Sequence, residues 1–401
     1  MTDPQPTPWW RGPRFDDWFA DAVFAEIARL RRRAGGKRHV FGDPTMDEDG
    51  LGLDSLDRLR LSAALAGLVG GGKAPADRFE RLATWGQWLE EARRLAAASD
   101  TLGFRTSGST GRPKLVRHPL AVLVEEVDES AAAFAPRRIV SLVPAHHLYG
   151  FLFGVLLPSR LGIAAEDGRS TSLTGLLREA TPGTLFVAAP THVAALVDTG
   201  ATLGPEITLV ASGGPFAADD HRAALALGFA RVTEIYGSTE TGGVGRRDDP
   251  AAPFRLFDRW RRGADETIVA VADDTRRLRL PDVAIFRDAR DFDLGERRDA
   301  AATIGGTTVH PTSIARVLTS HPFVAAAFVR PMRPEEGDRL KAFVIPTAAA
   351  PMPREFAASL DRFVTERLSP PERPRAWTFG PRPPLDDRGK IVDWPIEPDA
   401  A

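Results

Sequence analysis

The sequence contains no cysteine, no long apolar run and almost no net charge. Without cysteine the chain can form no disulfide, no thiolate metal site and no cysteine nucleophile. No apolar run reaches the length that a membrane-spanning helix needs. The formal net charge of −2 gives no indication of a nucleic-acid partner. The first residues lack a basic stretch followed by an apolar one, so we expect no signal peptide and a cytoplasmic location.

The composition is typical of a globular protein with more than one domain. The chain has 401 residues, of which 43% are hydrophobic and 26% are charged. This length exceeds what one hydrophobic core usually serves, so we expect two or three domains. With 36 glycines and 33 prolines spread along the chain, many loops are also expected.

The most informative stretch is the decapeptide RTSGSTGRPK at residues 105–114. Its glycines allow successive backbone N–H groups to turn toward one point and let a ligand approach closely. Such a concave row of N–H groups binds anions, and hydroxyls and a lysine add donors and charge. The stretch therefore predicts a polyphosphate site, against the alternative of a polar surface loop. The residues concerned are Thr106, Ser107, Gly108, Ser109, Thr110, Gly111 and Lys114.

A second candidate segment follows an apolar run at residues 209–211, which predicts a buried strand that ends in a glycine turn. Ligands of open α/β sheets bind beyond the carboxyl ends of strands, where such turns lie. Shortly afterwards the chain reads YGSTE at residues 236–240. Tyr236 offers a flat face for a base, and the carboxylate of Glu240 is a suitable ligand for Mg²⁺. Taken alone, this pentapeptide is equally compatible with a turn that ends in a capping glutamate.

These segments resemble, in sequence and in order, motifs of the adenylate-forming ligases, which include acyl-CoA synthetases, peptide adenylation domains and luciferases. Residues 106–114 resemble the phosphate loop, residues 212–214 the adenine-side loop, and residues 236–240 the YGxTE motif. The resemblance implies ATP and Mg²⁺ as cofactors. It implies catalytic roles for Thr239 and Glu240 and metal binding by Glu240 and Thr110. The further residues that it places at the nucleotide are Ser212, Gly213, Gly214, Tyr236, Gly237 and Ser238.

A charged segment at residues 282–299 resembles the end of the large domain in the same family. There, an aspartate that binds both ribose hydroxyls precedes by fifteen residues an arginine that opens an Arg-x-Asp hinge. Asp282 and Arg297 have this separation, so the resemblance implies that both contact ATP and that Asp299 is the hinge. Pro281 and Thr303 replace the glycine and the lysine that are usual in the family. From the residues alone, a charged and solvated β-hairpin is the alternative.

A Gly-Lys pair near the C-terminus, at Lys390, resembles the position from which a lysine enters the site for the first half-reaction. A positive charge there would stabilise the negative charges that the attacking carboxylate and the α-phosphate bring together. An ordinary C-terminal tail is the alternative.

The sequence PAHHLYG at residues 144–150 resembles the family's PxxHxxG segment, in which a histidine lies beside the acyl group. The resemblance places His147, Gly150 and Gly214 at the acyl pocket and makes His147 catalytic. Two adjacent histidines are also candidate metal ligands, but neighbouring side chains of a strand point to opposite faces, which favours the acyl gate. Since no carboxylate stands beside this motif to hold an ammonium group, we expect a plain carboxylic acid as substrate.

The first 99 residues are shorter than the segment that usually precedes the phosphate loop, and they contain their own pattern. Residues 15–33 form an amphipathic pattern, and a helix is expected from the DSL element at 54–56, where Asp54 or Ser55 is a natural N-cap. In this helix Leu61, Leu65 and Leu68 share one face, and a Thr-Trp helix start follows at residue 84. The segment resembles an acyl carrier protein, which would make Ser55 a phosphopantetheine site. The favoured interpretation is a helical bundle that only packs on the ligase.

These observations predict an α/β fold in three parts. Residues 1–99 form a helical, carrier-like segment, residues 100–298 form the large nucleotide- and acyl-binding domain, and residues 299–401 form a small mobile α+β domain. In the small domain we expect a strand turn at Gly305-Gly306 and helices near residues 312–320 and 354–368.

The predicted activity is an ATP-dependent acid–thiol ligase. It would activate a carboxylic acid, of the hydroxybenzoate type, as acyl-AMP and transfer it to the phosphopantetheine thiol of a carrier protein. The short N-terminus resembles the ligases of aryl-polyene and xanthomonadin pigment clusters. The alternatives are an acyl-CoA synthetase that uses free CoA, a non-catalytic nucleotide sensor, and a luciferase-like oxidoreductase. Retention of Lys114, Glu240, Asp282 and Lys390 argues against a sensor.

Overall fold

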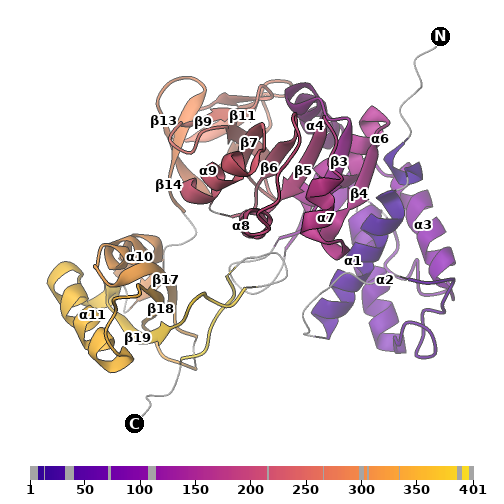
Figure 1. The fold of residues 1–401 in the computed structure, drawn as a ribbon. Helices are drawn as coiled ribbons and strands as arrows, with labels where there is room; N and C mark the ends of the chain where they lie inside the picture. The colour runs from indigo at the N-terminus through magenta and orange to yellow at the C-terminus, as the bar shows by residue number, and fades with distance from the viewer. Residues whose placement is uncertain are drawn as a thin grey trace. The chain divides into compact units, whose positions relative to one another are not determined.

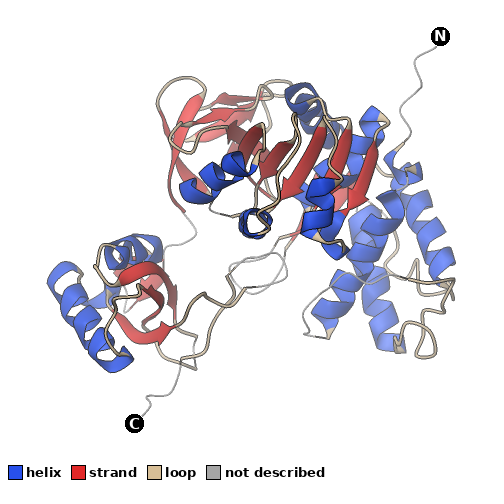
Figure 2. Ribbon diagram, viewed as in Figure 1, coloured by secondary structure: helices blue, strands red, loops and turns tan. Residues whose placement is uncertain are grey.

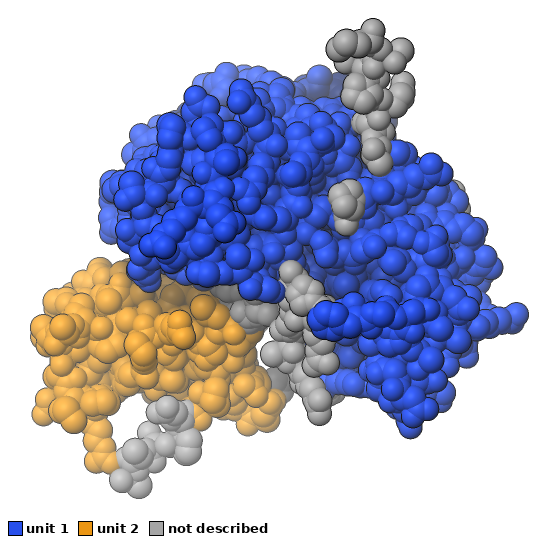
Figure 3. Space-filling view, turned by 45° about the vertical axis from the view of Figure 1, so that its right-hand side comes forward, with its two compact units in different colours: residues 1–278, 286–292, 387–389 blue, residues 279–285, 293–386, 390–401 orange. Residues whose placement is uncertain are grey.

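The computed structural model divides into two compact units (Figure 3). Unit 1 comprises residues 1–278, 286–292 and 387–389, and unit 2 comprises residues 279–285, 293–386 and 390–401. The residues that the structure describes are 8–12, 14–31, 40–70, 74–106, 114–214, 216–264, 266–297, 302–304, 307–333, 335–385 and 391–396. Residues 107–111, Asp299, Lys390 and the side chain of Arg297, all with expected roles, lie outside this description.

The largest sheet mixes parallel and antiparallel strands (Figures 1 and 2). It has nine strands: β3 (Arg138–Ser141), β4 (Ala164–Asp167), β5 (Thr184–Ala188), β6 (Thr208–Ala211), β7 (Arg231–Ser238), β8 (Gly242–Arg247), β9 (Phe254–Leu256), β13 (Asp282–Phe286) and β14 (Asp291–Arg297). Their order is β13-β14-β9-β8-β7-β6-β5-β3-β4. From β4 to β7 each neighbouring pair is parallel, and from β7 through β8 and β9 to β14 each pair is antiparallel.

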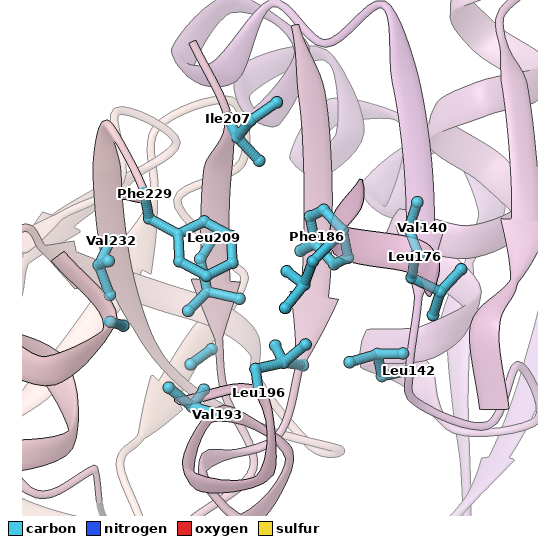
Figure 4. Packing of buried hydrophobic residues seen from close by; sticks show 14 of the residues in the cluster. Val140, Leu142, Leu176, Phe186, Val193, Leu196, Ile207, Leu209, Phe229 and Val232 are labelled. Carbon is cyan, nitrogen blue, oxygen red and sulfur yellow. The ribbon is translucent and has the colours of Figure 1, made fainter. Parts of the chain in front are cut away.

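The parallel strands β3, β5 and β6 are buried along most of their length because helices cover both faces of the sheet. Strand β5 is apolar after its first residue and buried throughout, and β6 confirms the strand expected at residues 209–211. The helices of unit 1 that follow the first hairpin are α4 (Leu120–Phe134), α5 (Leu148–Phe151), η2 (Leu152–Leu156), α6 (Leu157–Leu161), η3 (Gly168–Ser170), α7 (Leu173–Arg178), α8 (Pro190–Asp198) and α9 (Ala218–Leu227). One core lies between the parallel strands and α7, α8 and α9 (Figure 4).

Three helices lie within the first 99 residues, namely α1 (Arg14–Leu30), α2 (Ser55–Val69) and α3 (Trp85–Ala98), and the 3-10 helix η1 (Trp9–Arg11) precedes them. Local capping explains where two of them begin. The side chain of Asp54 accepts a hydrogen bond from the backbone of Asp57, and Thr84 forms a capping box with Gln87. The expected apolar face of α2 is buried. These helices belong to the same compact unit as the sheet, and the boundary expected at residue 99 stays a prediction.

Two further small sheets belong to the large part of the chain. The antiparallel hairpin of β1 (Thr101–Arg105) and β2 (Leu115–Pro119) stands apart from the nine-stranded sheet. A three-stranded sheet contains β10 (Trp260–Arg262), β11 (Thr267–Ala270) and β12 (Arg277–Arg279).

Unit 2 contains a three-stranded sheet with two helices packed against it. Its elements are β15 (Ala302–Ile304), β16 (Thr307–Val309), α10 (Pro311–Thr319), β17 (Val324–Pro331), β18 (Leu340–Pro346), α11 (Pro353–Arg367), η5 (Pro370–Glu372) and β19 (Pro374–Phe379). The helices α10 and α11 confirm the two that were predicted. Strands β15 and β16 pair antiparallel around residues 305–306, which lie outside the description. The α/β architecture with a large and a small part is thus the predicted one.

Candidate functional site

The base of the predicted phosphate loop is a β-hairpin. Thr106 directly follows β1, and Lys114 directly precedes β2. Two hydrogen bonds between these residues close the hairpin. The Thr106 amide donates to the Lys114 carbonyl over 2.9 Å, and the Lys114 amide donates to Thr106 Oγ1 over 3.1 Å. Thr106 is buried and Lys114 is exposed. The hairpin therefore fixes both ends of the loop, whereas the residues between them remain predictions.

Three loops of the site leave the carboxyl ends of strands in the parallel part of the sheet. The loop after β3 contains His147, the turn after β6 contains Ser212, and β7 runs into the YGSTE segment. Ser212, just after β6, bonds to both neighbouring strands: its amide donates to the carbonyl of Ala188 at the end of β5, and its hydroxyl donates to the carbonyl of Ile235 in β7 over 2.8 Å. The sheet thus brings together segments that lie far apart in the sequence, at the edge where α/β proteins bind ligands.

The turn after β6 presents backbone toward open space. Gly213 has φ +96°, a conformation that side-chain-bearing residues rarely adopt. A Cβ at Gly213 or Gly214 would have no atom within 4 Å, and both residues are exposed. The geometry suits a turn against which a flat ligand lies, as expected for an adenine-side loop.

The YGSTE segment is the end of a strand followed by a tight turn. Tyr236 packs its half-buried ring near Phe254 and Phe292, with centroid distances of 5.8 and 6.0 Å. Gly237 lies where the pairing of β7 with β8 shifts register. Ser238 Oγ accepts hydrogen bonds from the amides of Glu240 and Thr241, each over 3.2 Å. The backbone of Glu240 is therefore fixed while the residue is exposed.

A buried histidine that the sequence analysis missed supports this turn. His118 of β2 donates from Nε2 to the carbonyl of Thr239 over 2.6 Å, because a carbonyl can only accept. Burial lowers the pKa of His118, and the hydrogen bond opposes this only in part, so the ring is neutral near pH 7. The contact joins the phosphate-loop hairpin to the YGSTE turn. Because His118 and Thr239 lie far apart in the sequence, no local pattern predicts that they meet.

A buried ion pair beneath the turn was also missed. Glu126 of α4 accepts from the Gly243 amide over 2.7 Å and pairs with Arg259 Nη2 at 2.6 Å. Arg259 donates in turn to the Gly243 carbonyl over 2.6 Å. Burial raises the pKa of Glu126, while the charge of Arg259 and the Gly243 amide lower it. Both partners hold the backbone that follows the YGSTE turn.

The acyl-side segment is a turn followed by a helix, so the strand geometry assumed for the two histidines is wrong. His147 is the N-cap of α5, and the ring centroids of His146 and His147 are only 3.9 Å apart. Gly150 is required here, because a Cβ would lie 2.1 Å from the Pro144 carbonyl oxygen. Among the described residues no group of three metal-ligating His, Cys, Asp or Glu side chains occurs. The role of His147 as the acyl gate stays a prediction.

A carboxylate does approach the acyl-side segment, although none is near it in sequence. Asp21 of α1 accepts a hydrogen bond from the Ala145 amide over 2.8 Å. Arg169 donates to both carboxylate oxygens of Asp21, over 2.7 and 2.8 Å. The carboxylate is buried and its lone pairs are engaged, so it is not a binding group for a substrate ammonium.

The described residues suit a magnesium ion that ATP itself partly coordinates. Mg²⁺ is commonly bound by one or two carboxylates together with substrate phosphates and water. Glu240 supplies one exposed carboxylate on a fixed turn, and no larger acidic cluster accompanies it in the described part of the chain. Glu240 therefore fits the predicted metal role, and Thr110 lies outside the described residues.

The remaining predicted nucleotide residues lie on β13 and β14. Asp282 begins β13 and is half-buried, and Arg297 ends β14. The two strands are neighbours in the sheet, as the hairpin alternative required. Because Asp282 and Arg297 belong to unit 2, the contact of Asp282 with ribose stays a prediction.

The segment that contains Lys390 is attached to unit 2 on both sides. Leu385 and Ile391 form an isolated antiparallel bridge. The completely buried Lys341 bonds to the Trp394 carbonyl over 2.7 Å and to Asp393, just beyond Lys390. The flanking residues are thus fixed, while Lys390 itself lies outside the description.

Comparison with known proteins identifies the family. The model of the AMP-binding enzyme family matches residues 104–282, and that of the AMP-binding enzyme C-terminal domain matches residues 313–390. The chain is 35% identical over 384 residues to a 4-coumarate–CoA ligase of Rhodobacter capsulatus, covering 93% of this chain and 97% of that protein. It is 33% identical over 384 residues to a 4-coumarate–CoA ligase of Halorhodospira halophila, covering 91% and 95%.

Solved structures of low identity share the fold. One is o-succinylbenzoate CoA synthetase from Bacillus subtilis in complex with ATP and a magnesium ion, with a TM-score of 0.54 and 19% identity over 72% of this chain and 68% of that chain. Another is ATP-bound MatB from Rhodopseudomonas palustris, with a TM-score of 0.56 and 17% identity over 76% and 70%. Among the described residues, no helix is both long enough and apolar enough to cross a membrane.

The matches to the family models and to the curated relatives together show the family. The chain is an enzyme of the adenylate-forming superfamily and belongs to its AMP-forming acid–CoA ligases, which use ATP and Mg²⁺.

Proposed function

We propose that the enzyme joins an aromatic carboxylic acid of the hydroxycinnamate type to the thiol of CoA. The observation that carries this proposal is the similarity, over almost the full length, to three proteins named 4-coumarate–CoA ligase. The aromatic acid agrees with the expectation from sequence, while these relatives favour hydroxycinnamate over hydroxybenzoate and CoA over a carrier protein. The pigment-cluster subtype and the cytoplasmic location stay predictions.

In the first step, a carboxylate oxygen of the acid attacks the α-phosphorus of ATP, and the bond to pyrophosphate breaks. The loop from Thr106 to Lys114 binds the phosphates, and Glu240 holds Mg²⁺, which supplies charge neutralisation and orientation when it is bound. Tyr236 stacks on the adenine and Asp282 binds the ribose. Lys390 stabilises the negative charge that accumulates between the acid and the α-phosphate.

In the second step, the thiol sulfur attacks the acyl carbon, the bond to AMP breaks, and the thiol proton leaves to solvent. His147 lies beside the acyl group and controls access to it. Closure around the acyl-adenylate excludes water, which would otherwise hydrolyse it. The small domain rotates at Asp299 between the two steps and withdraws Lys390.

The carrier-protein alternative depends on Ser55. This serine is exposed at the first position of α2, where the helix dipole favours a phosphate. Against it, α1 of the same segment is attached to the rest of unit 1 by ion pairs of its buried carboxylates, Asp21 with Arg169 and Glu26 with Arg105. A carrier must move to deliver its acyl group, and these contacts favour a supporting role for the helices.

The test measures pyrophosphate release with 4-coumarate, cinnamate, 4-hydroxybenzoate and acetate, first without thiol and then with CoA or a carrier protein. We expect the strongest release with 4-coumarate and thioester formation with CoA. Release with none of the acids would contradict the proposal. A mass increase of one phosphopantetheine arm after treatment with a phosphopantetheinyl transferase and CoA, absent in Ser55→Ala, would instead establish the carrier alternative.

An Asp299→Pro variant is expected to retain acyl-adenylate formation and to lose thioester formation. Proline fixes φ and blocks the backbone rotation that a hinge needs. Both half-reactions can be measured separately by pyrophosphate release and by CoA consumption with supplied acyl-adenylate. The control is Asp293→Pro, at the point where the chain enters unit 2 on β14, which we expect to impair folding and both half-reactions alike. Unchanged thioester output in Asp299→Pro would show that this residue is not the hinge.

A further inference from the structure

Helix α1 contacts both ends of the acyl-side segment. At the first end, its Asp21 accepts a hydrogen bond from the Ala145 amide. At the other end, the ring of Phe151 lies 6.0 Å from Trp18 of α1 and 5.0 Å from Trp9, measured between centroids. Figure 1 shows α1 beside the β4 end of the sheet. Between these two contacts lies His147, which begins α5.

The hydrogen bond that Asp21 accepts from the Ala145 amide is almost completely shielded from solvent. Asp21 is 8% exposed and Ala145 is 2% exposed. Arg169, which follows β4, bonds to both oxygens of Asp21 and to Asp167 at the end of the same strand. Burial raises the pKa of Asp21, but the charge and hydrogen bonds of Arg169 and the Ala145 amide act in the opposite direction. The carboxylate therefore joins three elements, α1, the β4 end and the acyl-side turn.

A buried ion pair is weak evidence for stability, because desolvation consumes much of its attraction. Its directional bonds nevertheless specify where the partners lie. Here the backbone amide that donates to Asp21 is two residues from His147, in a turn so tight that a Cβ at Gly150 would lie 2.1 Å from the Pro144 carbonyl oxygen. Loss of the Asp21 acceptor would leave the buried Ala145 amide unpaired, which costs more than the bond contributes.

We propose that Asp21 is a positioning residue that holds the Pro144–Phe151 segment, and with it His147, in the geometry that binds the carboxylic acid. Helix α1 of the N-terminal segment is thereby part of the machinery for acid recognition, acting through the backbone of the acyl-side turn. The inference rests on the proposed acyl role of His147.

Three variants separate positioning from stability. Asp21→Ala removes the acceptor, and Asp21→Asn removes the charge but keeps an acceptor for the Ala145 amide. Glu26→Gln is the matched control. Glu26 lies five residues after Asp21 on α1, and it is also a buried carboxylate that pairs with an arginine, Arg105. If Asp21→Ala does not fold, Asp21→Leu fills the volume without an acceptor and leaves Asp167 to pair with Arg169.

We expect Asp21→Ala to raise the KM for the acid about tenfold, the change that corresponds to about 1.4 kcal/mol, with kcat and the KM for ATP within about twofold. Asp21→Asn should retain a near-native KM for the acid, and Glu26→Gln should leave that KM unchanged. Amide hydrogen exchange of residues 145–147 should accelerate in Asp21→Ala and not in Glu26→Gln.

An unchanged KM for the acid in folded Asp21→Ala, or an equal rise in Glu26→Gln, would overturn the inference. Native-like exchange at residues 145–147 in Asp21→Ala would overturn it independently of activity. If the wild-type enzyme turns over none of the acids, the proposed function fails, whereas the exchange experiment still decides whether Asp21 holds the segment.

Discussion

Replacement of Lys390 by alanine is expected to reduce acyl-adenylate formation by roughly 10²–10³-fold and to leave thioester formation from supplied acyl-adenylate largely intact. This is the usual scale for removing one preorganised group that stabilises charge in a transition state. The lysine acts only on charge that develops in the first step, so the second step should not depend on it. Pyrophosphate release measures the first half-reaction, and CoA consumption with synthetic acyl-adenylate measures the second.

Arg388→Ala is the matched control for this experiment, because it removes a cation two residues earlier in the same segment. We expect it to affect either half-reaction by no more than a few-fold. Equal losses of both half-reactions in Lys390→Ala would contradict the assignment and would indicate a general structural role. The residues that flank Lys390, namely Leu385, Ile391 and Trp394, are held by contacts within unit 2. The unfolding transition of the variant is therefore measured in parallel, and a wild-type transition excludes a general loss of structure in unit 2.

Replacement of Glu126 by leucine is expected to lower the free energy of unfolding by about 3–5 kcal/mol, the usual cost of leaving one partner of a buried ion pair unpaired. The Arg259 side chain is only 2% exposed and would keep its charge without a carboxylate beside it. The Gly243 amide would also lose its acceptor. Chemical denaturation of wild type and variant measures the difference.

The same helix offers a matched control for Glu126. Asp128 of α4 pairs with Arg160 at 2.7 Å, but both side chains are more than 40% exposed. Because exposed pairs contribute about 0–1 kcal/mol, Asp128→Asn should change stability little. Glu126→Gln, which keeps an acceptor for the Gly243 amide, should fall between the two. A loss below about 1 kcal/mol in Glu126→Leu would show that the pair is not a main support of the YGSTE turn.

Local signals explain which parts of the fold were predictable. The capping bonds of Asp54 and Thr84 involve residues three apart, so their pattern is visible in the sequence and locates the starts of α2 and α3. The helices α10 and α11 and the strand β6 follow from local apolar patterns in the same way. The interpretation of His146 and His147 failed because a strand was assumed where the chain turns into a helix.

The sequence by itself determined the chemistry of the enzyme. Its ordered motifs contain the glycines, hydroxyls, Glu240 and Lys390 that predict nucleotide binding and acid activation, and these depend on residue types at short spacing. Only the tertiary structure decided which distant groups support them. His118 meets Thr239, Glu126 meets Arg259, and Asp21 meets Ala145 across more than one hundred residues. Such pairs are selected by sheet order and helix packing, because a buried charge or amide must find its partner wherever the fold places it.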